Sequence, residues 1–258
     1  MSGAVMTDDP AGAGTPPPSL AIARFCDFID LGPTESSLID DLTDANRTIR
    51  RGAIIRGAGA PVAHVFLLKE GWVTSSITLP NGARQIVRVH LPGDILGTPS
   101  MASPRAAETL IAVTAAVIAP ISLIAIRRLF TGAPRLGMAL FLEAQQERIL
   151  LMDRVTSLGR TSAAQALGAF LLYVHDRLDA IGQVHDGSFV LPLTLEQIAD
   201  VLGVTPTHVH RTFRELKDRD LVLRSGSEMT LVDPDRMRQF AAIPTRNWVR
   251  NPVWLGQE

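Results

Sequence analysis

The sequence predicts an α+β fold in which an antiparallel β-roll comes first, a long helix follows, and a pair of short helices with a β-hairpin comes last. Three observations predict it. Short β-favouring segments separated by turn signals fill residues 50–127. Apolar residues at helical spacing occupy 136–158, and two capped short helices precede a hairpin within 194–232.

These changes of pattern divide the chain into five expected parts. The first is a tail, the second contains N-terminal helices and the β-roll, the third is the long helix, and the fourth contains the helix pair and hairpin. A short tail of unassigned role ends the chain, and it could pack on the fourth part. The boundaries that we expect are 1–19, 20–133, 134–159, 160–240 and 241–258.

Composition limits the class of protein. The 258 residues are 46% hydrophobic, which is enough for a buried core and excludes global disorder. Cys26 is the only cysteine, so one chain cannot form an internal disulfide or a metal site built from several thiolates. The formal net charge of -1 provides no overall basic field, so any site for a polyanion must be a local patch.

The first nineteen residues are rich in proline and glycine, include the run Pro16–Pro18, and carry almost nothing apolar. Such a segment cannot bury enough surface to offset its ordering, so we expect a disordered tail. It also lacks the positive start and apolar stretch of a secretory signal. We therefore expect a cytoplasmic protein.

The β-roll is predicted from short strands at spacings near ten residues. Asn81-Gly82 lies between two of them and is a strong hairpin signal, because both residues tolerate positive φ. Leu91–Asp94 forms another sharp turn, and Leu20–Leu42 before the roll indicates one or two helices. The expected strands are Ala53–Ile55, Val62–Leu68, Trp72–Leu79, Ala83–Leu91 and a pair within 109–126.

Thr109–Ile126 carries no charge over eighteen residues, which is the lower limit for a membrane helix. It is rich in Val, Ile and Thr, however, and Pro120 would break a spanning helix. Two buried strands with a turn near Ala119-Pro120 explain the same residues, because strands covered on both faces are continuously apolar. We expect no membrane association.

The long helix repeats apolar residues in alternating steps of four and three, as a coiled-coil seam does. Leucines elsewhere around the same helix indicate that it buries more than one face. Two interpretations remain open: a core helix within one chain, or a helix that packs on its own β-roll and on a symmetry mate. The expected seam is Met138, Leu142, Gln145, Ile149, Met152 and Thr156.

Residues 194–232 have the pattern of helix, tight turn, helix and hairpin. Thr194 and Gln197 form a capping box, and Gly203 can adopt the left-handed conformation that ends the first helix. Thr205 caps the second helix and Pro206 suits its first turn, where a missing N–H costs nothing. Two short helices joined in this way form a helix-turn-helix, whose second helix enters the DNA major groove.

The outer face of the second helix is locally basic. Arg211 is the candidate for a bidentate contact with guanine O6 and N7, and the residues of the first turn are suited to phosphate. Leu221–Arg224 and Met229–Val232, joined by Ser225–Glu228, form the expected wing. An amphipathic helix pair without a ligand is the alternative. The candidate DNA-binding residues are Thr205, Thr207, His208, His210, Arg211 and Arg214.

The run Leu193–Leu221 (LTLEQIADVLGVTPTHVHRTFRELKDRDL) resembles the helix-turn-helix of bacterial Crp/Fnr-type transcription regulators. The resemblance extends back through Leu91–Gly97 (LPGDILG) and covers roughly residues 25–235. It implies a cyclic-nucleotide-binding-like sensory β-roll, a dimerisation helix and a winged helix-turn-helix. The implied partners are a second copy of the chain, double-stranded DNA with a palindromic operator, RNA polymerase, and a small-molecule effector of unknown identity.

The family's base-reading arginine falls on Arg211, and its neighbour, often Ser or Gly in the family, falls on His210. The glutamate that many members place in the first turn falls on Thr207, where this sequence departs from the pattern. We therefore expect an operator preference that differs from that of such members.

The β-roll also departs from the family's cyclic AMP site. The glycine of the ribose-binding Gly-Glu pair falls on Gly97, but Thr98 replaces the glutamate. At the phosphate-binding Arg-Ser pair the sequence has Glu108-Thr109, with Arg105 three residues early. A carboxylate repels phosphate, and no other fork of donors is evident there. We expect no cyclic AMP control by the usual mode.

Other sensing chemistry is limited by residue type. An iron–sulfur cluster on four cysteines cannot form with Cys26 alone. Haem or redox sensing through Cys26, His64 or His90 is an alternative. A cupin-like β-roll metalloenzyme is another, but Val89-His90-Leu91 offers one histidine where such sites use two. No catalytic constellation is evident, so we expect a regulator without a bound cofactor or metal, and not an enzyme.

Overall fold

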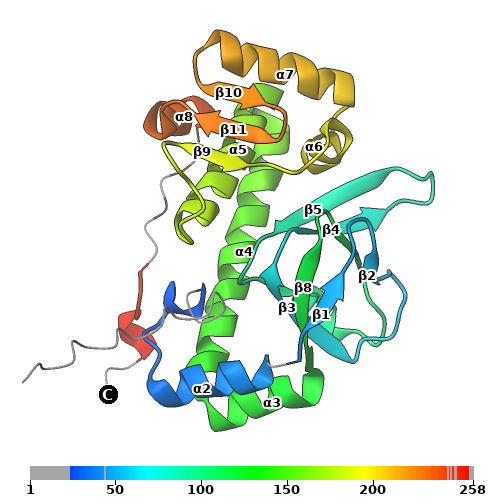
Figure 1. Cartoon of the computed structure of the whole chain (residues 1–258), viewed down its shortest axis with the longest axis vertical. Helices are drawn as coiled ribbons and strands as arrows, with labels where there is room; N and C mark the ends of the chain where they lie inside the picture. Colours follow the sequence, from blue (N-terminus) through cyan, green and yellow to red (C-terminus); the bar gives the residue numbers. More distant parts are fainter. Residues whose placement is uncertain (1–23, 44, 243, 245, 247–248, 256–258) are drawn as a thin grey trace, which may run out of the picture.

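The computed structural model places the β-roll against one side of a long helix and the winged unit at that helix's C-terminal end (Figure 1). None of the described helices combines the length and apolar character that crossing a bilayer requires. The disordered tail predicted for 1–19 lies outside the described part of the chain. The structure describes residues 24–43, 45–242, 244, 246 and 249–255.

Two four-stranded antiparallel sheets form the β-roll, with orders β1-β8-β3-β6 and β2-β7-β4-β5. The β4–β5 hairpin turns at Asn81-Gly82, as predicted, and Gly82 has φ +84°. A short 3-10 helix, η1 (Thr98–Ala102), follows β6. The strands are β1 (Arg47–Ile49), β2 (Ile54–Arg56), β3 (His64–Glu70), β4 (Val73–Thr78), β5 (Arg84–His90), β6 (Ile95–Leu96), β7 (Thr109–Ala112) and β8 (Ala116–Ser122).

The turn predicted near Ala119-Pro120 is wrong. The chain turns between β7 and β8, at residues 113–115, and Pro120 lies within β8 opposite Phe66 of β3. The neighbouring strand β1 pairs with β8 only as far as Ile118. Pro120 therefore lies beyond the end of that ladder, where a missing N–H disrupts no hydrogen bond to β1.

Helices α2 (Pro33–Leu42) and α3 (Leu123–Gly132) pack near the N-terminal half of α4 (Pro134–Arg160), the long helix. The predicted helix 134–159 matches α4 to within one residue. Ser122 caps α3, and Ser162 forms a capping box with Gln165 at the start of α5 (Ala163–Asp179).

The winged unit consists of α6 (Leu195–Leu202), α7 (Pro206–Asp218), α8 (Pro234–Ala241) and a three-stranded sheet. Its strands are β9 (Ser188–Val190), β10 (Val222–Ser225) and β11 (Glu228–Leu231), in the order β10-β11-β9. The predicted wing strands are shifted by one residue, and β9 and α8 were not predicted. Strand β9 has only three residues and thus a weak signal. Helix α8 has a clear local signal that was overlooked, because Asp233 caps it and Pro234 is its first residue.

The β-roll and the winged unit share one hydrophobic cluster. Trp72, Ile86 and Val89 of the roll belong to the same cluster as Leu171 of α5 and Ile198 of α6. Side chains from both parts thus exclude water from a common interior, and each part supports the position of the other.

The C-terminal segment does not pack where it was expected. The Asn251 backbone N–H donates to the Phe28 carbonyl oxygen at 2.9 Å, and Arg250 pairs with Asp30 at 2.5 Å. In Figure 1 this red segment lies beside the N-terminal helices, far from the winged unit. The suggestion that the tail packs on the winged unit is therefore wrong for residues 249–255.

Candidate DNA-binding site

Local capping interactions fix the two helices of the motif. The Gln197 backbone N–H donates to Thr194 Oγ1 at 3.2 Å, and the Thr194 backbone N–H donates to Gln197 Oε1 at 2.9 Å. Gly203 ends α6 with φ +71°, a conformation that other residues adopt only with strain. Thr205 Oγ1 then accepts from the His208 backbone N–H at 3.3 Å and starts α7. The predicted caps are confirmed.

The inner face of α7 is buried, as the periodicity predicted. Val209, Phe213 and Leu216 are buried, and Val209 and Leu216 have no exposed surface. They join the cluster that contains Ile198 and Ala199 of α6. Because the apolar side is fixed against α6 and α5, the opposite side of α7 faces solvent.

The six predicted DNA-binding residues lie together at the start and on the outer face of α7. His208 is half-buried and the others are exposed. The Arg211 Nη2 atom lies 3.2 Å from His208 Nε2, so the two side chains touch. This surface is formed by Thr205, Thr207, His208, His210, Arg211 and Arg214.

Arg224 of the wing was missed by sequence reasoning. Its guanidinium carbon lies 4.7 Å from the centroid of the Phe213 ring, and its Nε donates to the Gly226 carbonyl oxygen at 3.2 Å. Arginine stacks on aromatic faces in this way. The contact ties the wing to the C-terminal half of α7, and only the fold reveals it, because Phe213 and Arg224 belong to different elements.

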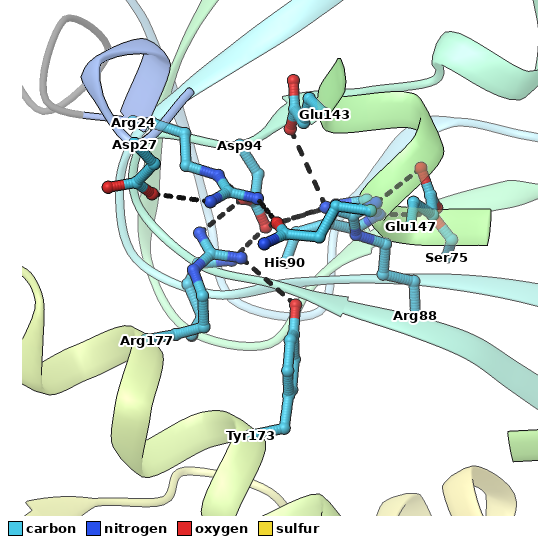
Figure 2. A network of polar contacts seen from close by, with 12 residues as sticks. Arg24, Asp27, Ser75, Arg88, His90, Asp94, Glu143, Glu147, Tyr173 and Arg177 are labelled. Carbon is cyan, nitrogen blue, oxygen red and sulfur yellow. Dashed lines mark hydrogen bonds and ion pairs between the residues drawn. The ribbon is translucent and has the colours of Figure 1, made fainter. Parts of the chain in front are cut away.

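A second group of polar residues, the ionic cluster, joins the β-roll to the long helix and to α5 (Figure 2). Asp94 has no exposed surface and lies at its centre. Arg177 of α5 donates to Asp94 Oδ1 at 2.6 Å, and Arg24 and Arg88 lie 3.8 and 3.7 Å from the carboxylate. The ionic cluster comprises Arg24, Asp27, Arg88, His90, Asp94, Glu143, Glu147 and Arg177.

The ionic cluster fixes the protonation of its members. Burial alone raises the pKa of Asp94, but the guanidiniums of Arg177, Arg88 and Arg24 together hold that pKa well below its ordinary value. Burial, reinforced by Arg88, lowers the pKa of His90 to about 3. His90 is therefore neutral at neutral pH.

The two histidines considered as haem ligands have different surroundings. His90 Nε2 contacts Ser75 Oγ at 2.6 Å inside the roll, whereas His64 is exposed at the start of β3. Cys26 is half-buried on the N-terminal segment. Among the described residues, no three His, Cys, Asp or Glu side chains converge in a way that could hold a metal ion.

The position of the family's cyclic AMP phosphate site is filled by protein. Arg56 of β2 donates to Glu108 Oε1 at 2.8 Å and to the Gly97 carbonyl oxygen at 3.2 Å. Ser100 donates to the other Glu108 oxygen at 2.6 Å. The expectation that no fork of donors lies there is thus wrong: Arg56 supplies one, but Glu108 already occupies it. The residues present do not fit a bound cyclic nucleotide phosphate.

The β4–β5 hairpin also contacts the helix-turn-helix directly. Arg84 pairs with Asp200 of α6 at 2.5 Å, and Gln85 Nε2 donates to the Val201 carbonyl oxygen at 3.2 Å. Arg154 of α4 donates to the same carbonyl and to that of Ile86. The C-terminal end of α6 is therefore held by both the roll and the long helix.

Two family models match the chain: a cyclic nucleotide-binding domain at residues 46–132 and a Crp-like helix-turn-helix domain at 165–240. The chain is 32% identical over 179 residues to the transcriptional activatory protein AadR of Rhodopseudomonas palustris, covering 69% of this chain and 73% of AadR. It is 34% identical over 164 residues to the nitrogen fixation regulation protein FixK of Bradyrhizobium diazoefficiens, covering 64% and 68%.

The fold is similar to that of solved regulators. The structure of FixK2 from Bradyrhizobium japonicum has a TM-score of 0.69 and 25% identity, and the match covers 78% of this chain and 98% of FixK2. Capping geometry, basic outer face, family models and relatives lead to one conclusion. The chain belongs to the Crp/Fnr family of sequence-specific DNA-binding transcription regulators, whose members are not enzymes.

Proposed function

We propose that the outer face of α7 enters the DNA major groove and that Arg211 reads a guanine. The observation that carries the proposal is the exposure of Arg211 beside the helix N-terminus while the opposite face of α7 is buried. Thr205 and Thr207 lie in the first turn, where hydroxyls and free backbone N–H groups meet phosphate oxygens. His208, His210 and Arg214 complete the contact surface.

Arg211→Ala is expected to lower affinity for the operator by about 1–3 kcal/mol and to relax discrimination at one base pair. The operator is first found by selecting bound duplexes from a random pool, and affinities are then measured on it and on variants changed at single positions. Arg236→Ala, an exposed arginine on α8, is the matched control and keeps wild-type affinity. A loss that is equal on all sequences makes Arg211 a phosphate contact instead.

We propose that the regulator acts as a homodimer on a palindromic operator, with half-sites about 34 Å apart. Its long helix α4 is covered on one side by the β-roll, through the Glu147–Arg88 pair. On another side it is covered by the terminal segments, since Gln146 accepts from Arg24 and Asp153 pairs with Arg246. The face that remains exposed includes Phe141, Ala144, Arg148, Leu151, Met152, Val155 and Thr156.

This dimer face differs from the predicted seam. Met152 and Thr156 are common to both. The other four residues of the predicted seam are half-buried within the chain: Met138, Leu142, Gln145 and Ile149. The exposed residues still follow steps of three and four along the helix, as a helix-pairing surface requires. Of the two interpretations left open, we propose the one in which α4 packs both on its own β-roll and on a symmetry mate.

We also propose that cyclic AMP does not control DNA binding, because the Glu108 carboxylate and its partners Arg56 and Ser100 fill the phosphate position. Adding cyclic AMP at millimolar concentration is expected to leave operator affinity unchanged. The measurement is fluorescence anisotropy of labelled operator, with calorimetry as a direct binding check. An increase in affinity, or measurable heat of binding, contradicts the proposal.

The remaining assignments are proposals of the same kind. The division at 20–133, 134–159 and 160–240 into sensory, dimerisation and DNA-binding parts agrees with the element boundaries. A cytoplasmic location, contact with RNA polymerase and an effector of unidentified chemistry follow from the role of a bacterial DNA-binding regulator. Comparing transcription from an operator-bearing template with and without the protein tests whether the bound regulator acts on RNA polymerase.

A further inference from the structure

Arg211 has a side-chain partner on its own helix. Its Nη2 atom lies 3.2 Å from Nε2 of His208, one turn earlier on α7. The backbone of His208 is fixed on both sides, because its N–H donates to Thr205 Oγ1 and its carbonyl oxygen accepts from Thr212 Oγ1 at 2.8 Å. His208 is half-buried while Arg211 is exposed, so the imidazole is the less mobile of the two groups.

The chemistry of this contact sets the protonation of His208. A guanidinium has five N–H donors and no acceptor, so the imidazole Nε2 must supply a lone pair. That requires neutral His208 with its proton on Nδ1. A doubly protonated imidazole has no acceptor left, and its positive charge lies beside that of Arg211. One guanidinium N–H is used in the contact, and the others stay free for a guanine edge.

We propose that His208 is a positioning residue that holds Arg211 in its base-reading orientation, so that operator recognition weakens when His208 is protonated. The inference rests on the proposed reading of a base by Arg211. An arginine that is already held in place before DNA binds loses less rotamer freedom on binding. The smaller entropy cost strengthens the specific complex, in which Arg211 contacts a base.

The surroundings of the imidazole contain no group that opposes this effect. In the described part of the chain, Arg211 is the one charged side chain recorded within hydrogen-bonding or ion-pairing distance of His208. His210 and Arg214 are exposed neighbours on the same helix, and neither is a carboxylate that would stabilise a protonated imidazole.

The test measures affinity for operator and for unrelated duplex from about pH 7.5 to about pH 5.5, where imidazoles gain their proton. For the wild type, the ratio of specific to non-specific affinity is expected to fall about threefold to tenfold, the effect of releasing one side chain. His208→Gln keeps an acceptor oxygen that does not titrate, so it retains the ratio at all pH values. His208→Ala has the reduced ratio throughout. His185→Gln changes an exposed histidine in the loop before β9, outside the contact surface, and behaves as the wild type.

Two results would overturn the proposal. One is a ratio that rises in acid, which makes protonated His208 itself a donor to a base edge; the other is a pH dependence in His208→Gln equal to that of the wild type. The proposal is also overturned if His208→Ala retains the wild-type ratio at about pH 7.5. Arg211→Ala, measured in parallel, tests base reading by Arg211 separately from positioning by His208. If it keeps full sequence preference, the assignment of Arg211 as base reader fails, whatever His208 does.

Discussion

Asp94→Ala is expected to lower the free energy of unfolding by about 3–5 kcal/mol, because removing one partner from a buried ion group leaves uncompensated charge. The Asp94 carboxylate is fully buried and faces the guanidiniums of Arg24, Arg88 and Arg177. Among the residues that the structure describes, the buried Nε atoms of Arg24 and Arg88 have no hydrogen-bond partner, so no described group is in place to replace the carboxylate. Denaturant-induced unfolding at neutral pH measures the effect.

Asp176→Ala is the matched control. Asp176 pairs with Arg238 at 3.2 Å, and about half of each side chain is exposed, so its loss costs roughly 0–1 kcal/mol. The two variants remove the same group and differ in burial. If both lower stability by the same small amount, the ionic cluster does not hold the β-roll, α4 and α5 together. A large loss for Asp94→Ala alone shows that it does.

The helix-turn-helix could be predicted from sequence because its signals are local. Thr194, Gln197, Gly203 and Thr205 each act on backbone groups within four residues of themselves. Such interactions depend little on the rest of the fold. Most strands of the roll were located for a similar reason, but the short strands β1 and β6 were not predicted. The turn was wrongly placed at Pro120 because only the fold shows that β1 stops pairing with β8 before that residue.

The ionic cluster and the Arg56–Glu108 pair could not be predicted in this way. Arg177 and Asp94 are 83 residues apart, and Arg56 and Glu108 are 52 apart. In a chain whose cations are nearly all arginine, no local pattern marks the ones that become buried. The proposed dimer face of α4 differs from the predicted seam because apolar residues surround the helix. Which of them are covered is decided by the β-roll and the terminal segments.

Replacing Met152 and Val155 together by glutamate is expected to abolish dimerisation and operator binding. Both side chains lie on the uncovered face of α4, with 59% and 70% of their surface exposed in the single chain. Folding of one chain therefore tolerates the change. In a dimer each glutamate faces a symmetry-related apolar surface, and burying an unpaired carboxylate costs several kcal/mol. At about 1.4 kcal/mol for each tenfold step, the dimer dissociation constant rises at least about a hundredfold.

Sedimentation velocity at micromolar concentration and operator anisotropy measure the two effects, and thermal unfolding checks that the chain still folds. Ile124→Glu is the control, since Ile124 is 71% exposed but lies on α3, outside the proposed face. That variant remains dimeric and binds DNA. If the double variant stays dimeric, α4 does not form the interface. If it is monomeric yet binds the operator with wild-type affinity, two recognition helices are not needed. The joint loss is expected because each half-site alone supplies only part of the phosphate and base contacts.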